Sequence, residues 1–317
     1  MSNPRLMTVL GPIAPAEMGI VDAHTHVWIE PVANADPDAP VLFDETAVLT
    51  ELCQFKAAGG SGLVDCQPGG CGRNGRMLSQ LAEQSGVHIV ACTGFHRRIY
   101  YPPDAPLWQI DAEAAADLFV TELRDGLMET AVAEQPVRAG FIKIAGEATM
   151  AATPQHLLEA AAMASLATGA AIEMHTEKGA AVEEFLQFFV DQGVDPQRLV
   201  FCHVDKRPDF AFHQTIAQAG AMLEYDTFFR PKYQPEQNVW PLLMQMIETG
   251  LAAQIALATD MADSGMWQQF GGQPGMSAFM THIQARLVQM GVDDTIIKQL
   301  MGGNIANRLA IPQHRKE

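Results

Sequence analysis

Eight short apolar runs alternate with longer stretches of helical pattern along this chain of 317 residues. The runs lie at residues 20–27, 62–66, 88–94, 140–145, 170–176, 199–203, 221–226 and 255–260. The helical patterns lie at residues 45–58, 74–85, 111–134, 155–168, 179–192, 208–219, 235–250 and 276–290. Near-continuous apolar runs are typical of parallel strands that are covered on both faces. The eightfold alternation therefore predicts an α/β fold of the (β/α)8 barrel type.

The alternative α/β architecture is a doubly wound open sheet. No glycine-rich phosphate loop follows the first run, which disfavours this alternative. The sequence has no linker rich in Pro, Gly and Ser, so we expect a single domain over residues 1–317. The segment GGNIANRLAI, residues 302–311, is expected to close the barrel, with a short polar terminus after it.

The chain carries 37 acidic and 20 basic residues, which gives a formal net charge of −17. This charge argues against nucleic acids and anionic membranes as general partners. No apolar run approaches a membrane span, and the start, MSNPRLMTVLGP, lacks the charged and apolar regions of a secretory signal. The five cysteines show no C-x-x-C spacing, which indicates reduced side chains. We expect a cytoplasmic protein that assembles as a homodimer.

Titratable residues interrupt the apolar runs near their carboxyl ends. The stretch VDAHTHVWIE, residues 21–30, places His24 and His26 two residues apart, so both imidazoles point to one face of a strand. The fourth, fifth, sixth and eighth runs contribute Lys143, His175, His203 and Asp260. The carboxyl ends of the strands form the catalytic face of such a barrel. These side chains are therefore predicted to meet there.

A single buried histidine is more often satisfied by a hydrogen bond than bound to a metal. Six titratable residues at equivalent positions on five strands are difficult to explain as separate accidents. Four histidines and a carboxylate form a ligand set that suits zinc or a similar divalent ion. We therefore predict a metal centre, with zinc favoured and manganese, iron and cobalt as alternatives.

Lys143 is the unusual member of this set. An ammonium group in an apolar strand beside metal ions is destabilised by burial and by repulsion, and both effects lower its pKa. The resulting neutral amine can react with carbon dioxide to give a carbamate, whose two oxygens can bridge two cations. The alternative is an ordinary ion pair with a neighbouring acid such as Glu147 or Glu173.

Several motifs resemble those of the phosphotriesterase-related family of the amidohydrolase superfamily. They are the His-x-His of the first run, IKIA around Lys143, TPQHLLEAAAMASLATGAAIEMHT at residues 153–176, CHVD at 202–205, ATD at 258–260 and the closing GGNIANRLA. The resemblance spans about residues 8–311.

The resemblance implies a binuclear metal barrel. His24, His26 and Asp260 would hold one ion, and His175 and His203 would hold the other. Carbamylated Lys143 would bridge the two ions together with a hydroxide. Two ions lower the pKa of bound water toward neutrality, and Asp260 would accept the hydroxide proton. This set implies hydrolysis of a lactone, a carboxylic ester or a phosphoester.

Basic and tyrosine side chains follow several of the same runs. Those predicted to bind substrate are Lys206, Arg230, Tyr233, Arg97 and Arg98. Their position on the presumed catalytic face indicates a pocket for a small anionic molecule, because Arg and Lys are the usual phosphate ligands. The alternative is that they are solvated or paired with Asp205, Asp209, Asp226 and Glu236.

The Lys206 and Arg230-x-x-Tyr233 pattern is also similar to family branches that act on phosphorylated sugar lactones or cyclic phosphodiesters. We expect a metal-dependent hydrolase of a small phosphorylated lactone or other ester. The alternatives are an esterase for a cyclic or neutral phosphoester, a mononuclear decarboxylase or deaminase, and a catalytically idle metal-binding barrel.

Two features near these residues have open roles. Asp22 is expected to orient a histidine of the first run. The segment MWQQFGGQPGM, residues 266–276, suits either a movable lid or an ordered crossover loop.

Overall fold

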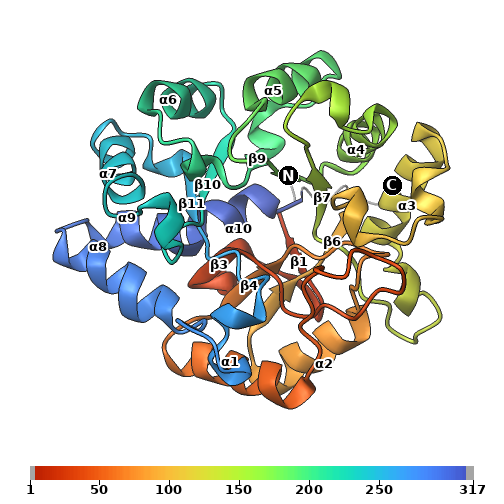
Figure 1. Ribbon diagram of the computed structural model, residues 1–317, viewed down its shortest axis with the longest axis horizontal. Coiled ribbons are helices and arrows are strands. Elements are labelled where there is room, and N and C mark those ends of the chain that lie inside the picture. Colours follow the sequence, from red (N-terminus) through yellow and green to blue (C-terminus); the bar gives the residue numbers. More distant parts are fainter. Residues whose placement is uncertain (1–3, 312–317) are drawn as a thin grey trace.

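The computed structural model describes residues 4–311, and its centre is a barrel of parallel strands enclosed by helices (Figure 1). The barrel strands are β3 (Val21–Thr25), β4 (Gly62–Asp65), β5 (His88–Val90), β6 (Cys92–Gly94), β7 (Phe141–Ala145), β8 (Ile172–His175), β9 (Leu199–Phe201), β10 (Met222–Tyr225) and β11 (Ile255–Leu257). Hydrogen bonds pair β3, β4 and β5 in order, and β6 to β11 in order, with every pairing parallel. The predicted α/β barrel is confirmed.

The strands bury two separate apolar clusters, which explains their near-continuous apolar sequences. One cluster packs the strands against the helices and includes Ile142, whereas the other fills the barrel and includes Phe141 and Met222. Side chains alternate along a strand, so residues two positions after the interior ones also point inward. Lys143 and Glu224 follow Phe141 and Met222 in this way. A polar layer therefore lies directly above an apolar one inside the barrel.

The barrel is closed by bonds between the first and last barrel strands. The Asp260 N–H donates to the His24 carbonyl at 2.9 Å, and the Thr259 N–H donates to Asp22 Oδ1 at 3.0 Å. Asp22 Oδ1 also accepts from the His24 N–H at 3.3 Å. Asp22 thus holds the backbone of His24, not its ring as expected, and it joins the two ends of the sheet.

The run at residues 88–94, predicted as one strand, is divided at Ala91 into β5 and β6. The first part pairs with β4 and the second with β7, so the chain changes partner within one barrel position. Gly94 has a φ of +107°, and a Cβ there would lie 1.9 Å from the Lys143 carbonyl oxygen. Glycine is therefore required where β6 comes closest to Lys143.

The outer helices are α1 (Glu45–Ala57), α2 (Gly75–Ser85), α3 (Ala112–Arg124), α4 (Gln155–Thr168), α5 (Val182–Asp191), α6 (Phe210–Gln218), α7 (Val239–Glu248) and α8 (Ala285–Gln289). The prediction of one helix over residues 111–134 is wrong, because α3 ends at Arg124. Gly126 has a φ of +152°, and a Cβ there would lie 2.5 Å from Pro136 Cβ. The chain turns at this glycine and packs against Pro136.

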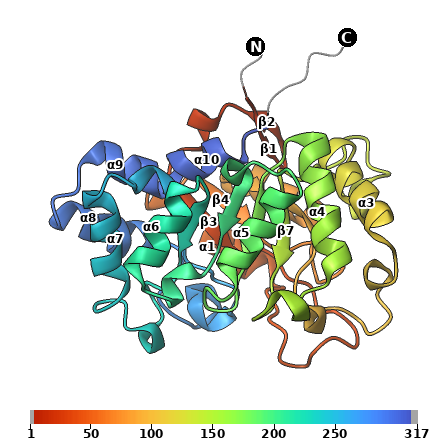
Figure 2. The same cartoon turned by 90° about the horizontal axis from the view of Figure 1, so that it is seen from above.

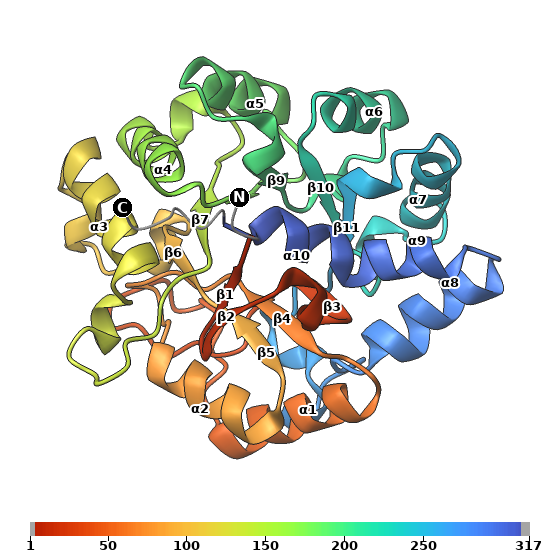
Figure 3. The same ribbon diagram turned by 180° about the vertical axis from the view of Figure 1, so that it is seen from behind.

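The amino ends of the strands are covered by a hairpin of β1 (Leu6–Thr8) and β2 (Gly11–Ile13) and by α10 (Asn304–Leu309), which follows α9 (Asp294–Lys298) (Figures 2 and 3). Arg5 and Ile311 exchange backbone hydrogen bonds of 3.0 and 2.9 Å. The segment 302–311 thus lies across this end of the barrel. The polar terminus expected after it lies outside the described residues. Within residues 4–311, no helix combines the length and apolar character needed to cross a membrane.

Candidate metal centre

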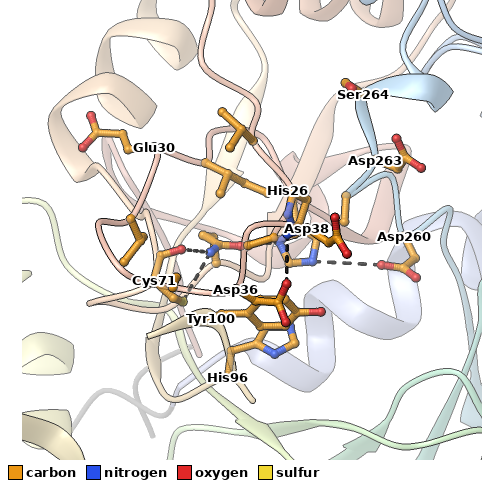
Figure 4. A pocket seen from close by; sticks show the side chains of 18 of the residues that line it. His26, Glu30, Asp36, Asp38, Cys71, His96, Tyr100, Asp260, Asp263 and Ser264 are labelled. Atoms are coloured by element: carbon orange, nitrogen blue, oxygen red, sulfur yellow. Dashed lines mark hydrogen bonds and ion pairs between the residues drawn. The ribbon is translucent and has the colours of Figure 1, made fainter. Parts of the chain in front are cut away.

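A cavity of about 720 Å³ opens at the carboxyl ends of the strands and is partly walled by the loop between β3 and α1. Its lining includes Asp260 and the floor histidines, which are His24, His26, His175 and His203. Figure 4 shows His26 and Asp260 in this cavity. These residues come from β3, β8 and the turns after β9 and β11. The barrel therefore gathers five of the six predicted metal-binding residues in one cavity, while their roles stay predictions.

Two floor histidines are held in the same way. His26 Nδ1 lies 2.7 Å from Gln67 Oε1, and His203 Nδ1 lies 2.6 Å from Asp226 Oδ2. An Nδ1–H that donates to an oxygen leaves the lone pair of a neutral ring on Nε2. Within residues 4–311, neither Nε2 makes a hydrogen bond. Burial lowers the pKa of His26 to about 4, so this ring is neutral at pH 7.

The other two floor histidines each lie beside a carboxylate, His24 through Nδ1 and His175 through Nε2. His24 Nδ1 lies 2.8 Å from Glu224 Oε1, which leaves Nε2 at 3.8 Å from Asp260 Oδ1. His175 Nε2 lies 3.1 Å from Glu177 Oε1, so Nδ1 is its available atom. Burial lowers the pKa of both rings. Burial also lowers the pKa of His203, so all four rings are neutral, and hydrogen bonds orient His26, His175 and His203 as metal ligands require.

Asp260 lies at the centre of this arrangement. Its Oδ1 is 4.0 Å from His26 Nε2, and its Oδ2 is 3.8 Å from His203 Nδ1. Asp260 and His203 have left-handed backbones, with φ of +49° and +64°. Such conformations cost about 1–3 kcal/mol each and accumulate at functional sites. Donor atoms of His24, His203 and Asp260 lie within 4.8 Å of one another, a spacing that one metal ion can span.

Lys143 is fully buried and makes an ion pair, with Nζ 3.2 Å from Glu173 Oε1. The lowered pKa expected for Lys143 beside metal ions stays a prediction, and in the chain without metal the pKa shifts the other way. Burial alone lowers the pKa of Lys143, but Cys202, Cys66 and Glu173 together raise it well above its ordinary value. Of the two acids considered from the sequence, Glu173 is the partner, whereas Glu147 pairs with Arg97.

Beneath the floor histidines, Lys143 is the cation of a buried acidic cluster. Donor atoms of His24, Glu173, Cys202 and Glu224 lie within 4.8 Å of one another. The Lys143 ammonium contacts three of them, at 3.5 Å from His24 Nδ1, 3.2 Å from Glu173 Oε1 and 3.4 Å from Cys202 Sγ. Both carboxylate oxygens of Glu224 are buried without a hydrogen bond in the described chain. A carbamate on Lys143 would remove the only positive charge from this cluster.

Arg230 lies at the edge of the cavity and contacts Asp260 directly. Its Nη2 donates to Asp260 Oδ2 at 2.9 Å, while its Nε is buried without a hydrogen bond in residues 4–311. Lys206 and Tyr233 pack together, with Lys206 Nζ 5.5 Å from the Tyr233 ring, but neither is among the lining residues. Burial opposes the charge of Lys206, yet Asp226, Asp260 and Asp205 raise its pKa above the ordinary value.

Arg97 and Arg98 are bound to the protein itself. Arg97 Nη1 lies 3.0 Å from Glu177 Oε1, so this arginine supports the acid that holds His175. Arg98 Nη1 donates to the Pro102 carbonyl at 2.8 Å, and its guanidinium lies 5.1 Å from the Trp108 ring. Neither arginine lines the main cavity. Both border a smaller hollow of about 350 Å³ beside it.

Sequence reasoning missed several lining residues. His96 is buried two positions after β6, and its ring centre lies 5.4 Å from that of His175. Its Nδ1 accepts from the Arg97 N–H at 2.7 Å. His96 follows the third apolar run, so the search for titratable residues at strand ends that found His175 would also have found His96. Acidic side chains also line the mouth: Glu30, Asp36, Asp38 and Asp263 (Figure 4).

The segment at residues 266–276 is an ordered crossover loop. Trp267 is fully buried, and its Nε1 donates to the Met261 carbonyl at 2.9 Å. Glu51, also fully buried, accepts from the backbone N–H groups of Gln269 and Met276, both at 2.9 Å. These anchors fix the loop to α1 and disfavour the alternative of a movable lid.

The parallel barrel and the cavity at its carboxyl end are those of an α/β-barrel hydrolase. The chain belongs to the phosphotriesterase family, whose model matches residues 4–308. A phospho-furanose lactonase from Mycoplasmopsis synoviae is 26% identical over 336 aligned positions, which cover 99% of this chain and 94% of the relative. An uncharacterized protein from Mycoplasma pneumoniae is 32% identical over 242 positions, 72% of this chain and 68% of the relative. The crystal structure of a lactonase from Listeria monocytogenes has a TM-score of 0.87 at 22% identity, covering 98% of this chain and 100% of that one.

Proposed function

We propose that this chain is a binuclear metal-dependent hydrolase that opens a small phosphorylated sugar lactone or cleaves a related ester. One observation carries the proposal. In His26, His175 and His203 a protein oxygen holds one ring nitrogen, and the other nitrogen makes no hydrogen bond in residues 4–311. In His24, Nδ1 faces Glu224 Oε1 at 2.8 Å and Lys143 Nζ at 3.5 Å, and Nε2 makes no hydrogen bond in the same residues. A neutral imidazole held in this way is a preformed metal ligand.

The donor set fits two divalent ions. His24, His26 and Asp260 would hold one, His175 and His203 the other, and Lys143, as its carbamate, would bridge them. Zinc suits these nitrogen and oxygen donors best, with manganese, iron and cobalt as alternatives. Such ions, when bound, supply hydroxide at neutral pH and polarise the reacting oxygen of the substrate.

Asp260 is proposed to take the proton that the attacking water gives up. Arg230 Nη2, at 2.9 Å from Asp260 Oδ2, fixes the carboxylate in the cavity. The Asp260 side chain is 15% exposed, so the proton has a route to solvent. Asp260 therefore combines a fixed position with access to bulk water, which a proton carrier requires.

A phosphate on the substrate is proposed to bind at the Arg230 edge of the cavity. The buried Arg230 Nε has no acceptor within the described residues, and an anion would satisfy it. Lys206 adds a positive charge, and Tyr233 adds a hydroxyl donor. The acids at the mouth confine anion binding to this edge. The name of the Mycoplasmopsis relative supports the same substrate class.

The test compares matched phosphorylated and unphosphorylated sugar lactones on the metal-loaded enzyme. Lys206→Met should lower kcat/KM for the phosphorylated lactone about ten- to a hundredfold, because one charge-assisted hydrogen bond contributes about 1.5–3 kcal/mol. The neutral lactone should be turned over almost as before. Lys232→Met is the matched control, since Lys232 also packs on Tyr233, at 5.1 Å, but is exposed.

Each part of the proposal can fail separately. Equal losses on both lactones would remove Lys206 from phosphate binding and leave the hydrolase intact. Faster turnover of a cyclic phosphodiester or a neutral triester would assign the enzyme to the phosphoesterase alternative. Metal analysis should find about two ions per chain. Two bound ions without turnover of any lactone or phosphoester would support the alternative of a catalytically idle metal-binding barrel.

A further inference from the structure

A second polar cavity, of about 290 Å³, lies at the amino ends of the strands, opposite the metal centre. It is bordered by α10, by the short helical turn before β9 and by the start of β10. Its polar lining residues are Asp195, Gln197, Arg198, Asn304, Asn307 and Arg308. This end of a barrel ordinarily serves stability, so two arginines in one hollow there need an explanation.

Both arginines are anchored by neutral groups and not by acids. Arg308 Nη1 donates to the Gly220 carbonyl at 3.0 Å, and its Nη2 donates to Gln254 Oε1 at 2.7 Å. Arg198 Nη1 donates to the Ala310 carbonyl at 3.2 Å. Within residues 4–311, neither guanidinium has a carboxylate within 4.0 Å.

The positive charge of this cavity is unbalanced. Burial, and then the neighbouring Arg198, lower the pKa of Arg308 to about 10, while Asp195 opposes the shift. Asp195 is itself engaged, since its Oδ1 accepts from the Gln197 N–H at 2.9 Å. Arg308 Nε, Arg198 Nε and Arg198 Nη2 make no hydrogen bond in the described chain. The lining thus carries two guanidinium charges against one carboxylate, and several guanidinium donors remain for a ligand.

We propose that this cavity is a binding site for a phosphate-class oxyanion, held between Arg198 and Arg308. A planar guanidinium presents paired donors that match the oxygens of phosphate, and two of them satisfy a doubly charged anion. Asn307 and Gln197 can supply further hydrogen bonds. The volume suits free phosphate or a small phosphomonoester. The site is separate from the metal centre and does not depend on the proposed function.

The experiment measures phosphate binding to the metal-loaded protein by equilibrium dialysis, with inorganic phosphate and ribose 5-phosphate tested separately. Arg198→Ala should lower the phosphate affinity of the proposed site by about tenfold or more, the scale of one lost charge-assisted hydrogen bond. Arg124→Ala is the control, because Arg124 also donates to a backbone carbonyl, at 2.7 Å from Ala167 O, but lies on α3 outside this cavity. Turnover of lactones should be unchanged in both variants.

A second variant guards against loss of folding. Asp195→Asn keeps the oxygen that caps the following turn but removes the acid, so binding should tighten by about two- to fivefold. Tungstate soaked into crystals should give an anomalous peak between Arg198 and Arg308. Unchanged phosphate affinity in a folded Arg198→Ala, or a peak only at the metal centre, would overturn the site. A hydrolase that proves inactive on lactones would leave this result unaffected.

Discussion

Buried histidines occur in two regions of this molecule, and they are bonded differently. On α6, behind β10, His213 Nδ1 lies 2.8 Å from the Tyr225 hydroxyl and Nε2 lies 2.9 Å from the Arg207 carbonyl. Both ring nitrogens are satisfied, so this ring is a structural cross-link. Each floor histidine has hydrogen bonds at no more than one ring nitrogen within residues 4–311. Burial alone therefore does not distinguish a candidate metal ligand, whereas an unsatisfied ring nitrogen beside the cavity separates the floor histidines from His213.

The largest effect is expected at a floor histidine. His203→Asn should remove metal and activity together, by more than the roughly 10- to 100-fold loss typical for a group outside the ligand set. His213→Gln should keep its full metal content, because no free nitrogen is lost. Metal per chain and kcat, measured on both variants, check the comparison. Loss of metal in the His213 variant would show that the number of hydrogen-bonded ring nitrogens does not distinguish the metal-binding histidines from the structural one.

The next largest effect is expected at the oxygens that hold the floor histidines. Gln67→Ala should weaken metal affinity about 10- to 100-fold, because His26 loses its orienting acceptor. Gln67→Glu keeps an oxygen at that position and should retain most of the affinity. Competition with a chelator measures both. Identical affinities for the two variants would contradict an orienting role.

His213 itself should make stability depend on pH. Its pKa is lowered by burial from 6.5 to about 4, so the unfolded chain binds more protons between these values. The stabilisation is complete above pH 6.5 and is lost as pH falls toward 4, by at most about 3 kcal/mol. Urea unfolding at pH 7 and pH 5 should show a smaller difference for His213→Gln than for wild type.

Other buried groups act in the opposite direction and make the paired comparison necessary. Burial raises the pKa of Asp22 and Asp65 from 3.8 to about 7, so their contribution is lost as pH rises through that range. Subtracting the unfolding free energy of the variant from that of wild type at each pH removes these contributions, which both proteins share. A difference that does not change between pH 5 and pH 7 would show that His213 is not neutral and depressed in the folded protein.

The smallest effect is expected at the mouth of the cavity. Asp36→Asn and Asp38→Asn remove exposed charges from the β3–α1 loop. Neither carboxylate forms a hydrogen bond with a floor histidine in the described residues. KM for an anionic lactone should fall by about two- to fivefold at low salt and be unchanged at high salt. A large change in kcat would show that this loop takes part in the chemistry.

The position of the floor histidines and Asp260 at the ends of apolar runs made their clustering in one cavity predictable from the sequence. His24, His26, His175, His203 and Asp260 each follow an apolar run, and parallel strands place such ends together. The partners of these residues were harder to find. Gln67 and Asp226 approach His26 and His203 only after the barrel closes, since 41 and 23 positions separate the pairs. Periodicity along one segment carries no information on contacts between segments.

The errors in the fold have equally local causes. Residues 125–134 continue the composition of α3, and only the backbone of Gly126 shows that the helix has ended. The break at Ala91 is not visible in an uninterrupted apolar run, because it comes from a change of strand partner. The sequence left two acids open as partners of Lys143, and the choice of Glu173 over Glu147 depends on the pairing of β7 with β8, which a single strand does not show.

The closing bonds between β3 and β11 also set the order of events when the protein is made. Asp22 and Thr259 are separated by 237 positions, so a ribosome must release nearly the whole chain before they can pair. His24 and His26 emerge early, but Asp260 reaches them only through the same closure. Contacts this distant in sequence slow folding. The nascent chain therefore completes the proposed metal centre last, after the rest of the barrel has been synthesised.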